Sequence, residues 1–464
     1  MKVKESDSNP FLQGNFAPWR LEGEALDLEV RGRIPDALAG TFYRNGPNPA
    51  YEPRGRYHWF DGDGMIHAIT LRDGRASYRN RWVKSEGLLE ERRAGRSLSS
   101  SLLDLTPSEL ASFKNTANTN IVHHAGKLLA LMEAALPTRL DPVSLDTLGV
   151  DDLGGRLAGP MTAHPKMDPE TGEMLFFGYS PFPPFLQYHV VDATGALVRS
   201  EAIDLAWPSM IHDFAITRDE VVFILCPLVF SFEDMEKRGG PFSWEPDRGT
   251  RLGVMPRNGG SADVQWFETD ASYVFHPMNA YRSGDEVVLD VSRYDRIRLM
   301  TPDAQHSEEG DSDDDARLHR WTLDLRRGGV KSAPLDDRAG EFPRIDERRL
   351  GHAHRFGYLA VRGSGEGPGM PVFSAIRKMD LDRGTTVTRE FGAGNGSGEP
   401  LFIPRHPGAE EDDGWVIALV YDSARNASDF LILDARDLGG EPEAVVSLPH
   451  RVPYGFHGNW VPAR

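Results

Sequence analysis

Short apolar runs that recur along the whole chain are the feature that most limits how it can fold. Each run has the length of one strand and is bounded by Gly, Pro, Asp or Asn, a pattern typical of strands joined by turns. The clearest runs are residues 128–132, 175–179, 221–225, 287–291, 359–361, 416–421 and 430–433. Over 464 residues, this pattern favours an all-β sandwich, barrel or propeller. A propeller of several four-stranded blades fits the length best, although no sequence repeat gives the number of blades.

The composition excludes several classes of protein. A formal net charge of −18 repels phosphate backbones, so we expect no nucleic-acid partner. Cys226 is the single cysteine, so the chain can form neither an internal disulfide nor a thiolate metal cage. One unpaired cysteine fits a reducing compartment, and we expect a cytoplasmic protein.

The sequence shows neither a signal peptide nor a membrane span. The charged residues 1–7 have no apolar segment behind them. The longest apolar run, residues 221–230, has about half of the roughly 20 residues that a span needs, so we expect at most peripheral contact with a membrane. No linker divides the chain. Residues 1–464 are therefore predicted to form one domain, with a flexible tail over residues 1–20.

Four histidines that each follow an apolar residue are the candidate metal ligands: His164, His212, His276 and His457. They are spread over most of the chain, whereas a zinc finger or a helical metal motif places its ligands close together. A radial fold could bring one ligand from each of four blades to a metal ion on its axis. The alternative is four scattered core histidines with ordinary hydrogen bonds. His352 and His354 could also share one face of a strand, as a metal pair or as part of an exposed turn.

The chain resembles the carotenoid cleavage oxygenase family, which includes the retinal pigment epithelial membrane protein and the lignostilbene dioxygenases. The resemblance runs nearly end to end, and its motifs occur in the family's order. They are YRNGPNP at 43–49, WFDGDGM at 59–65, NTN at 118–120, TAHPK at 162–166, IHDF at 211–214, FHPMNA at 275–280, GEP at 398–400 and FHG at 456–458. The resemblance implies a seven-bladed β-propeller that is capped on one face by loops and short helices.

The resemblance also implies the contents of the site. One Fe²⁺ per chain would lie on the axis, held by the four histidines, and the enzyme would cleave a carbon–carbon double bond with O2 to give two aldehyde products. Three glutamates would accept hydrogen bonds from ligand imidazoles and fix their tautomers: Glu133, Glu341 and Glu399. His164 would then be the ligand without a glutamate. Thr119 matches a position whose side chain crowds one open site on the iron. The alternative for Thr119 is a strand residue packed in the core.

The residue before the first glutamate bears on the substrate. Stilbene-cleaving members of the family place a Lys there, whereas this chain has Met132. An apolar side chain favours a polyene, so we expect a carotenoid or apocarotenoid substrate, with stilbene cleavage as the alternative. Candidate substrate contacts are Met132, Phe275 and Phe456. Residues 181–186 and 227–230 are apolar and could meet a membrane or fold onto the core.

A third interpretation is a propeller that only binds other molecules. Such a protein could keep the histidines and catalyse nothing. Metal analysis separates this interpretation from the enzyme, because a binding module need not hold iron. The sequence does not predict the oligomeric state.

Overall fold

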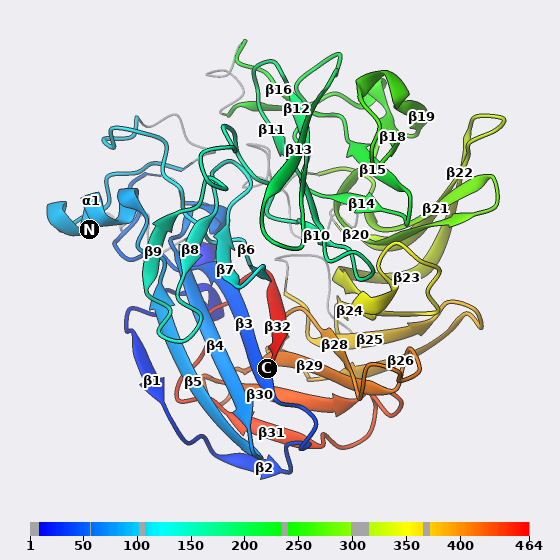
Figure 1. Cartoon of the computed structure of the whole chain (residues 1–464). Coiled ribbons are helices and arrows are strands. Elements are labelled where there is room, and N and C mark those ends of the chain that lie inside the picture. Colours follow the sequence, from blue (N-terminus) through cyan, green and yellow to red (C-terminus); the bar gives the residue numbers. More distant parts are fainter. Residues whose placement is uncertain are drawn as a thin grey trace.

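Seven antiparallel β-blades form a ring in the computed structural model of the chain (Figure 1). The structure describes residues 9–55, 57–101, 107–233, 240–297, 315–364 and 372–463. Each blade is antiparallel, and its innermost strand lies nearest the axis. Five of the blades are separate sheets, and the other two share one seven-stranded sheet, in which the long strand β23 belongs to both blades. The predicted all-β, seven-bladed propeller is confirmed.

The first four blades contain these strands, written from the axis outward. Blade 1 has β32 (Gly458–Pro462), β3 (Gly40–Pro47), β4 (Gly64–Arg72), β5 (Arg75–Trp82) and β1 (Gly23–Ala25). Blade 2 has β6 (Asn120–His124), β7 (Lys127–Leu131), β8 (Thr138–Leu140) and β9 (Thr147–Val150). Blade 3 has β10 (Lys166–Met167), β11 (Met174–Tyr179), β12 (Leu186–Val191) and β13 (Leu197–Ile203). Blade 4 has β14 (Phe214–Ile216), β15 (Glu220–Leu225), β18 (Thr250–Pro256) and β19 (Gln265–Thr269).

Three further blades complete the ring. Blade 5 has β20 (Tyr273–Ser283), β21 (Glu286–Tyr294), β22 (Arg317–Asp324) and the first part of β23 (Val330–Arg344). Blade 6 has the last part of β23, β24 (Phe356–Val361), β25 (Ala375–Asp380) and β26 (Thr385–Glu390). Blade 7 has β27 (Gly396–Ser397) and β28 (Leu401–Pro404), both paired with β29 (Gly414–Asp422), then β30 (Ala427–Asp434), β31 (Ala444–Ser447) and β2 (Val30–Gly32).

The two ends of the chain close the ring together. The C-terminal strand β32 pairs with β3, with Thr41 opposite Val461. Near the other end of the chain, β2 pairs with β31 in blade 7, with Val30 opposite Val446. Closure pairs the strand edges that an open sheet would leave exposed. It also carries the C-terminal residues to the centre of the molecule, where Figure 1 shows β32.

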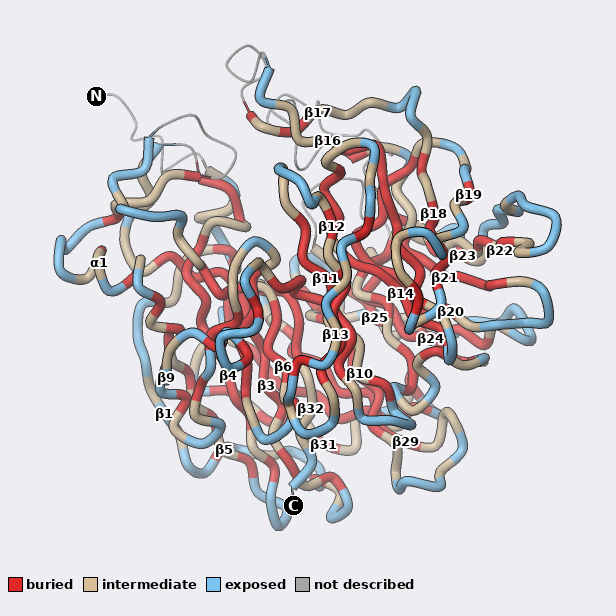
Figure 2. Tube along the Cα trace, turned by 45° about the horizontal axis from the view of Figure 1, so that its top comes forward, coloured by how far each residue is buried: buried red, intermediate tan, exposed pale blue. Residues whose placement is uncertain are grey.

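Apolar side chains fill the spaces between neighbouring blades. One cluster packs blades 3, 4 and 5 together and includes Phe177, Phe214 and Trp321. Another joins blades 7 and 1 through Phe430 and Phe42. Burying one such ring is worth about 1.5–3 kcal/mol, so the blades are held by face-to-face packing. Figure 2 shows this division, with buried strand residues inside and exposed turns at the periphery.

The cap contains one α-helix among the described residues, α1 (Glu86–Ala94). Ser85 begins it by accepting a hydrogen bond from the Leu88 N–H, and Gly95 ends it with a φ of +67°, a conformation that glycine adopts easily. The hairpin of β16 (Leu228–Phe230) and β17 (Phe242–Trp244) lies outside the seven blades. No helix in the described ranges is long and apolar enough to cross a membrane.

Residues 9–20 are packed against the body of the protein. They form two 3-10 turns, Pro10–Leu12 and Gly14–Phe16. The Phe16 ring is buried and meets the rings of Trp59 and Tyr454 at centroid distances of 5.1 and 4.9 Å. The predicted flexible tail over residues 1–20 is therefore wrong from residue 9 onward, because aromatic packing holds this segment. Residues 1–8 lie outside the described part of the chain.

Candidate metal centre

Four imidazoles from four blades meet near the axis. His164, His212 and His457 lie directly before or close to the innermost strands β10, β14 and β32, and His276 lies within β20. One nitrogen of each ring lies within 4.8 Å of the corresponding nitrogen of every other ring. These four side chains, here called the histidine cluster, come from blades 3, 4, 5 and 1. The sequence predicted that they meet, and the ring geometry is what brings them together.

The remaining three blades supply the three glutamates. Glu133 follows β7 of blade 2, Glu341 lies in β23 of blade 6, and Glu399 lies between β27 and β28 of blade 7. Each accepts a hydrogen bond from the Nδ1 atom of one histidine. The pairs are Glu133 with His212 at 2.7 Å, Glu341 with His276 at 2.7 Å and Glu399 with His457 at 3.0 Å. A proton on Nδ1 leaves the Nε2 lone pair free to face the centre.

His164 has no glutamate partner in the described structure, as the family resemblance implied. Its Nδ1 atom lies 3.7 Å from the Oδ2 atom of Asp213, which is too long for a hydrogen bond. Asp213 instead forms an ion pair with Lys166, at 2.8 Å. The cluster therefore has three rings fixed by carboxylates and one that is held by its backbone and its neighbours.

The donor set fits a metal ion. The Nε2 atom of His276 is buried and has no hydrogen-bond partner among the described residues. The Nε2 atoms of His164 and His212 face each other at 2.9 Å. Burial lowers the pKa of His164 well below its usual range, and burial also lowers the pKa of His276 and of His457. Neutral imidazoles are the form that binds metals, so the cluster can hold a transition-metal ion.

The charged side chains around the histidine cluster have a net negative charge that a dication would balance. Three glutamates surround it, and Arg344 lies 3.3 Å from Glu399. Burial alone would raise the pKa of Glu399, but Arg344 and His457 bring that pKa down to about 2. With three carboxylates and one guanidinium in place, an ion of charge +2 makes the centre neutral. A buried site of zero net charge avoids most of the cost of burying single charges.

Aromatic side chains cover one side of the cluster. The Phe275 ring lies 5.0 Å from His212 and 6.4 Å from Phe60, and Phe60 lies 5.5 Å from Phe456. Met132 is buried beside the first glutamate. The predicted substrate residues Phe275 and Phe456 therefore lie beside the ligand histidines, in surroundings that suit an apolar molecule.

Thr119 contacts the cluster through its backbone. Its carbonyl accepts a hydrogen bond from the His457 N–H at 3.2 Å. Its hydroxyl donates to the Oδ1 atom of Asn118 at 3.0 Å. The residue thus holds the backbone of one ligand, and its proposed effect on an open metal position stays a prediction.

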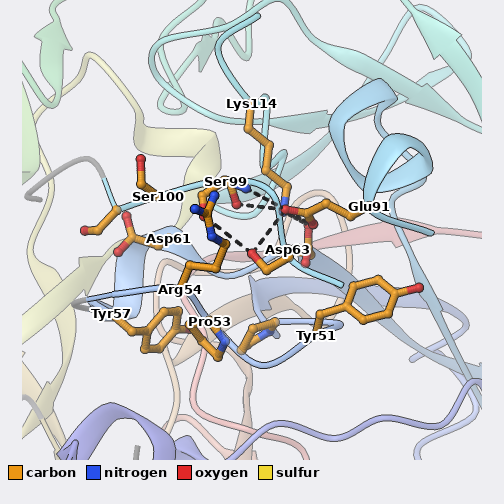
Figure 3. A pocket seen from close by; sticks show the side chains of 13 residues that line it. Tyr51, Pro53, Arg54, Tyr57, Asp61, Asp63, Glu91, Ser99, Ser100 and Lys114 are labelled. Carbon is orange, nitrogen blue, oxygen red and sulfur yellow. Dashed lines mark hydrogen bonds and ion pairs between the residues drawn. The ribbon is translucent and has the colours of Figure 1, made fainter. Parts of the chain in front are cut away.

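A second buried polar cluster lies under the cap (Figure 3). The Lys114 ammonium lies 2.7 Å from a carboxylate oxygen of Glu91 and 2.7 Å from one of Asp63. The other Glu91 oxygen accepts hydrogen bonds from the Leu98 and Ser99 N–H groups at 2.9 and 3.0 Å. This arrangement, here called the cap cluster, ties α1 to blade 1. The ammonium already occupies the position between the two carboxylates, so the cluster is an internal ion pair.

Tyr179 and Arg344 contact the glutamates, and neither contact was predicted. The Tyr179 hydroxyl donates to the Oε1 atom of Glu133 at 2.7 Å, and Arg344 holds Glu399 as described above. Arg344 lies in the stretch Glu341–Arg344 that carries the second glutamate, so its position was a usable signal. Tyr179 ends strand β11 and reads as an ordinary core aromatic. The candidate pair His352 and His354 is not a site, because His352 faces Glu170 and His354 faces Asp290.

Comparison with known proteins gives consistent matches over nearly the whole chain. The model of the family described as retinal pigment epithelial membrane protein matches residues 16–462. A carotenoid cleavage oxygenase of Mycobacterium tuberculosis is 37% identical, with 98% of each chain covered. The solved lignostilbene dioxygenase of Pseudomonas brassicacearum has a TM-score of 0.92 and 35% identity, covering 98% of this chain and 99% of that one. The cobalt-substituted apocarotenoid oxygenase of Synechocystis has a TM-score of 0.87 and 32% identity, covering 96% and 97%.

Proposed function

The chain belongs to the carotenoid cleavage oxygenase family, described as retinal pigment epithelial membrane protein, and on this premise we propose that it is an iron(II) dioxygenase. In the proposed reaction one double bond of a carotenoid or apocarotenoid breaks, and each of its carbons receives one atom of O2. The two products are aldehydes, and no further reductant is consumed. The observation that carries the proposal is the histidine cluster, with three of its rings fixed by glutamates.

His164, His212, His276 and His457 would hold the iron, one ion per chain. Iron(II) would supply redox activation of O2, which zinc in the same place cannot supply. The glutamates keep the Nδ1 protons in place, so that the ring nitrogens facing the centre stay unprotonated. Four histidine ligands would leave room on the ion for O2, and we propose that the Thr119 side chain would crowd one of the positions that stay open.

The aromatic side of the cluster would hold the substrate. Phe275, Phe456 and Met132 are the proposed contacts, and none of them can donate or accept a proton. Their work would be to position the double bond and to exclude water. This supports a polyene, because its cleavage site carries no polar group for the protein to recognise.

The test is product analysis under labelled oxygen. Iron-loaded protein is incubated with one carotenoid and one apocarotenal under ¹⁸O2, and the products are identified by mass spectrometry. We expect two aldehydes, each carrying one labelled oxygen at early times, before exchange with water. Label in only one product would contradict the dioxygenase assignment, and turnover by metal-free protein would contradict the iron assignment.

Cleavage of the central double bond of a hydroxystilbene is the second candidate. The high structural similarity to lignostilbene dioxygenase, with a TM-score of 0.92, favours it. Met132 argues against stilbene cleavage, because a thioether cannot bind a phenolate as a lysine can. A hydroxystilbene in the same assay panel separates the two, and a higher kcat/KM for the stilbene would reverse our preference.

We also propose a cytoplasmic protein that touches membranes through two aromatic side chains. Phe182 and Phe232 are 65% and 50% exposed, and their rings stack at a centroid distance of 5.7 Å. In the other apolar candidate, residues 227–230, the first three residues are buried and Phe230 is half-buried. Phe182→Asp is expected to reduce sedimentation with neutral phosphatidylcholine vesicles, whereas the control Val387→Asp, on blade 6, leaves it unchanged. Equal sedimentation of both variants would contradict docking through this pair.

A further inference from the structure

A cavity of about 330 Å³ reaches His164, His276 and His457, and its lining includes neither Phe275 nor Phe456. Residues that precede a ligand histidine in the sequence differ in position from those that follow it. Phe275 and Phe456 precede their histidines and join the aromatic cover. The residues that follow the histidines line the cavity: Pro165 to Met167 after His164, Asp213 after His212, Pro277 and Met278 after His276, and Asn459 to Pro462 after His457. We call this space the axial cavity.

The walls of the axial cavity next to the cluster carry charged groups beside the ring of Phe342. Lys166 and Asp213 form one ion pair there, at 2.8 Å, and Arg344 and Glu399 form another, at 3.3 Å. The Asn459 carboxamide accepts a hydrogen bond from Arg344 at 3.2 Å. These groups can replace part of the hydration shell of an ion. The rings of Phe60, Phe275 and Phe456 offer no such groups, so the cover that they form cannot replace the water that a dication loses.

The axial cavity also reaches the surface. Its wall along β32 begins at His457, which is 4% exposed, and ends at Pro462, which is exposed. At about 3.3 Å per residue, the five steps of this strand span about 16 Å. Glu347, another lining residue, has a side chain that is 50% exposed. Its carboxylate pairs with Arg344 at 3.1 Å, and the net negative charge of the protein attracts cations to this opening and repels anions.

We propose that the axial cavity is the route by which the metal ion enters and leaves the histidine cluster. The apolar substrate would use the aromatic side, so the metal ion and the substrate would have separate entrances. The proposal rests on the metal-binding part of the proposed function. It assigns a purpose to Lys166, Asp213 and Asn459, which the proposed cleavage reaction does not use.

The test narrows the axial cavity without touching a ligand. Met167 on β10 and Val461 on β32 both line it, and the variants Met167→Trp and Val461→Trp each place a larger ring in it. The uptake of Co²⁺ by metal-free protein is followed by absorbance. The release of Co²⁺ from the loaded protein to excess EDTA is followed in the same way. We expect both rates to fall by about tenfold or more while their ratio, the Kd for Co²⁺, stays unchanged. A barrier on the route slows both directions equally.

The matched control adds a ring on the aromatic side. Phe60→Trp is expected to leave both cobalt rates within about twofold of the unmodified protein. Unchanged release in a folded axial variant would overturn the proposal, and so would an equal slowing by Phe60→Trp. Either axial variant is sufficient if the other does not fold, as judged by circular dichroism. If the unmodified protein binds neither Co²⁺ nor Fe²⁺, the proposed function fails, which is a different result from normal binding with unchanged rates.

Discussion

The histidine cluster and the cap cluster are both buried groups of charged and polar side chains, yet only the histidine cluster offers the donor atoms of a metal site. In the cap cluster, Lys114 lies between Glu91 and Asp63 and supplies the positive charge from within. In the histidine cluster, the glutamates accept neutral imidazole N–H groups, and one buried ring nitrogen of His276 has no partner in the described structure. Buried carboxylates therefore mark a metal site only where the protein leaves their charge unmatched.

The two clusters also differ in the sequence separation of their residues. The cap cluster joins residues 63, 91 and 114, which lie within one region of the chain. The metal centre takes one side chain from every blade, from Glu133 to His457. A change in the cap cluster is thus expected to alter stability, and a change in the metal centre to alter metal binding.

The largest expected effect is the loss of a ligand. His212→Ala removes one of four donors and leaves Glu133 without its imidazole partner, so metal affinity is expected to fall by more than about 100-fold and turnover to vanish. Metal content and product formation measure this, with circular dichroism as the check on folding. His406→Ala, on an exposed turn, is the control and should bind metal normally. Full activity of the His212 variant without metal would refute the role of the cluster.

The next effect concerns stability alone. Lys114→Met leaves two buried carboxylates without a counter-ion, and we expect the free energy of unfolding to fall by about 3–5 kcal/mol. Metal stoichiometry of the folded protein should stay the same. Denaturant titration measures the change. Arg33→Met breaks the exposed pair with Asp36 and should cost at most about 0.5 kcal/mol. Loss of metal from the folded Lys114 variant would contradict the view that the cap cluster affects stability and not metal binding.

Removing one carboxylate charge is expected to have a smaller effect. Glu399→Gln keeps the shape of the side chain but removes a negative charge beside His457, so metal affinity and kcat are expected to fall by about 10- to 100-fold. Equilibrium titration with Fe²⁺ under anaerobic conditions measures the affinity. An unchanged affinity would show that Glu399 neither orients His457 nor balances the charge of the ion.

The smallest expected effect is the loss of the hydrogen bond between Tyr179 and Glu133, which is one contact further from the metal position than the bond between Glu133 and His212. Tyr179→Phe removes the donor to Glu133, a bond to a charged group worth about 1.5–3 kcal/mol. Part of this reaches the metal through His212, and we expect a loss of about threefold to tenfold in metal affinity. Tyr188→Phe is the matched control, because the buried Tyr188 hydroxyl has no partner among the described residues. Equal effects of the two substitutions would show that Tyr179 has only a packing role.

Much of the site could be predicted because its motifs are local. His164, His276 and His457 each lie in a short stretch that can be recognised without knowing the fold, and so do Glu341 and Glu399. Tyr179 could not be predicted in this way. An aromatic residue at the end of a strand is usually core, and only the position of blade 3 next to blade 2 brings its hydroxyl to Glu133. The packing of Phe16 on Trp59 escaped prediction for the same reason.

By itself, the sequence determined the class of fold and the candidate ligands, because strand length, turn residues and short motifs are properties of neighbouring residues. Only the tertiary structure decided which glutamate serves which histidine, that the blades without a ligand histidine supply the glutamates, and that β23 belongs to two blades. These are relations between segments far apart in the sequence. They exist because β32 pairs with β3 and closes the ring, which brings every innermost strand to one axis.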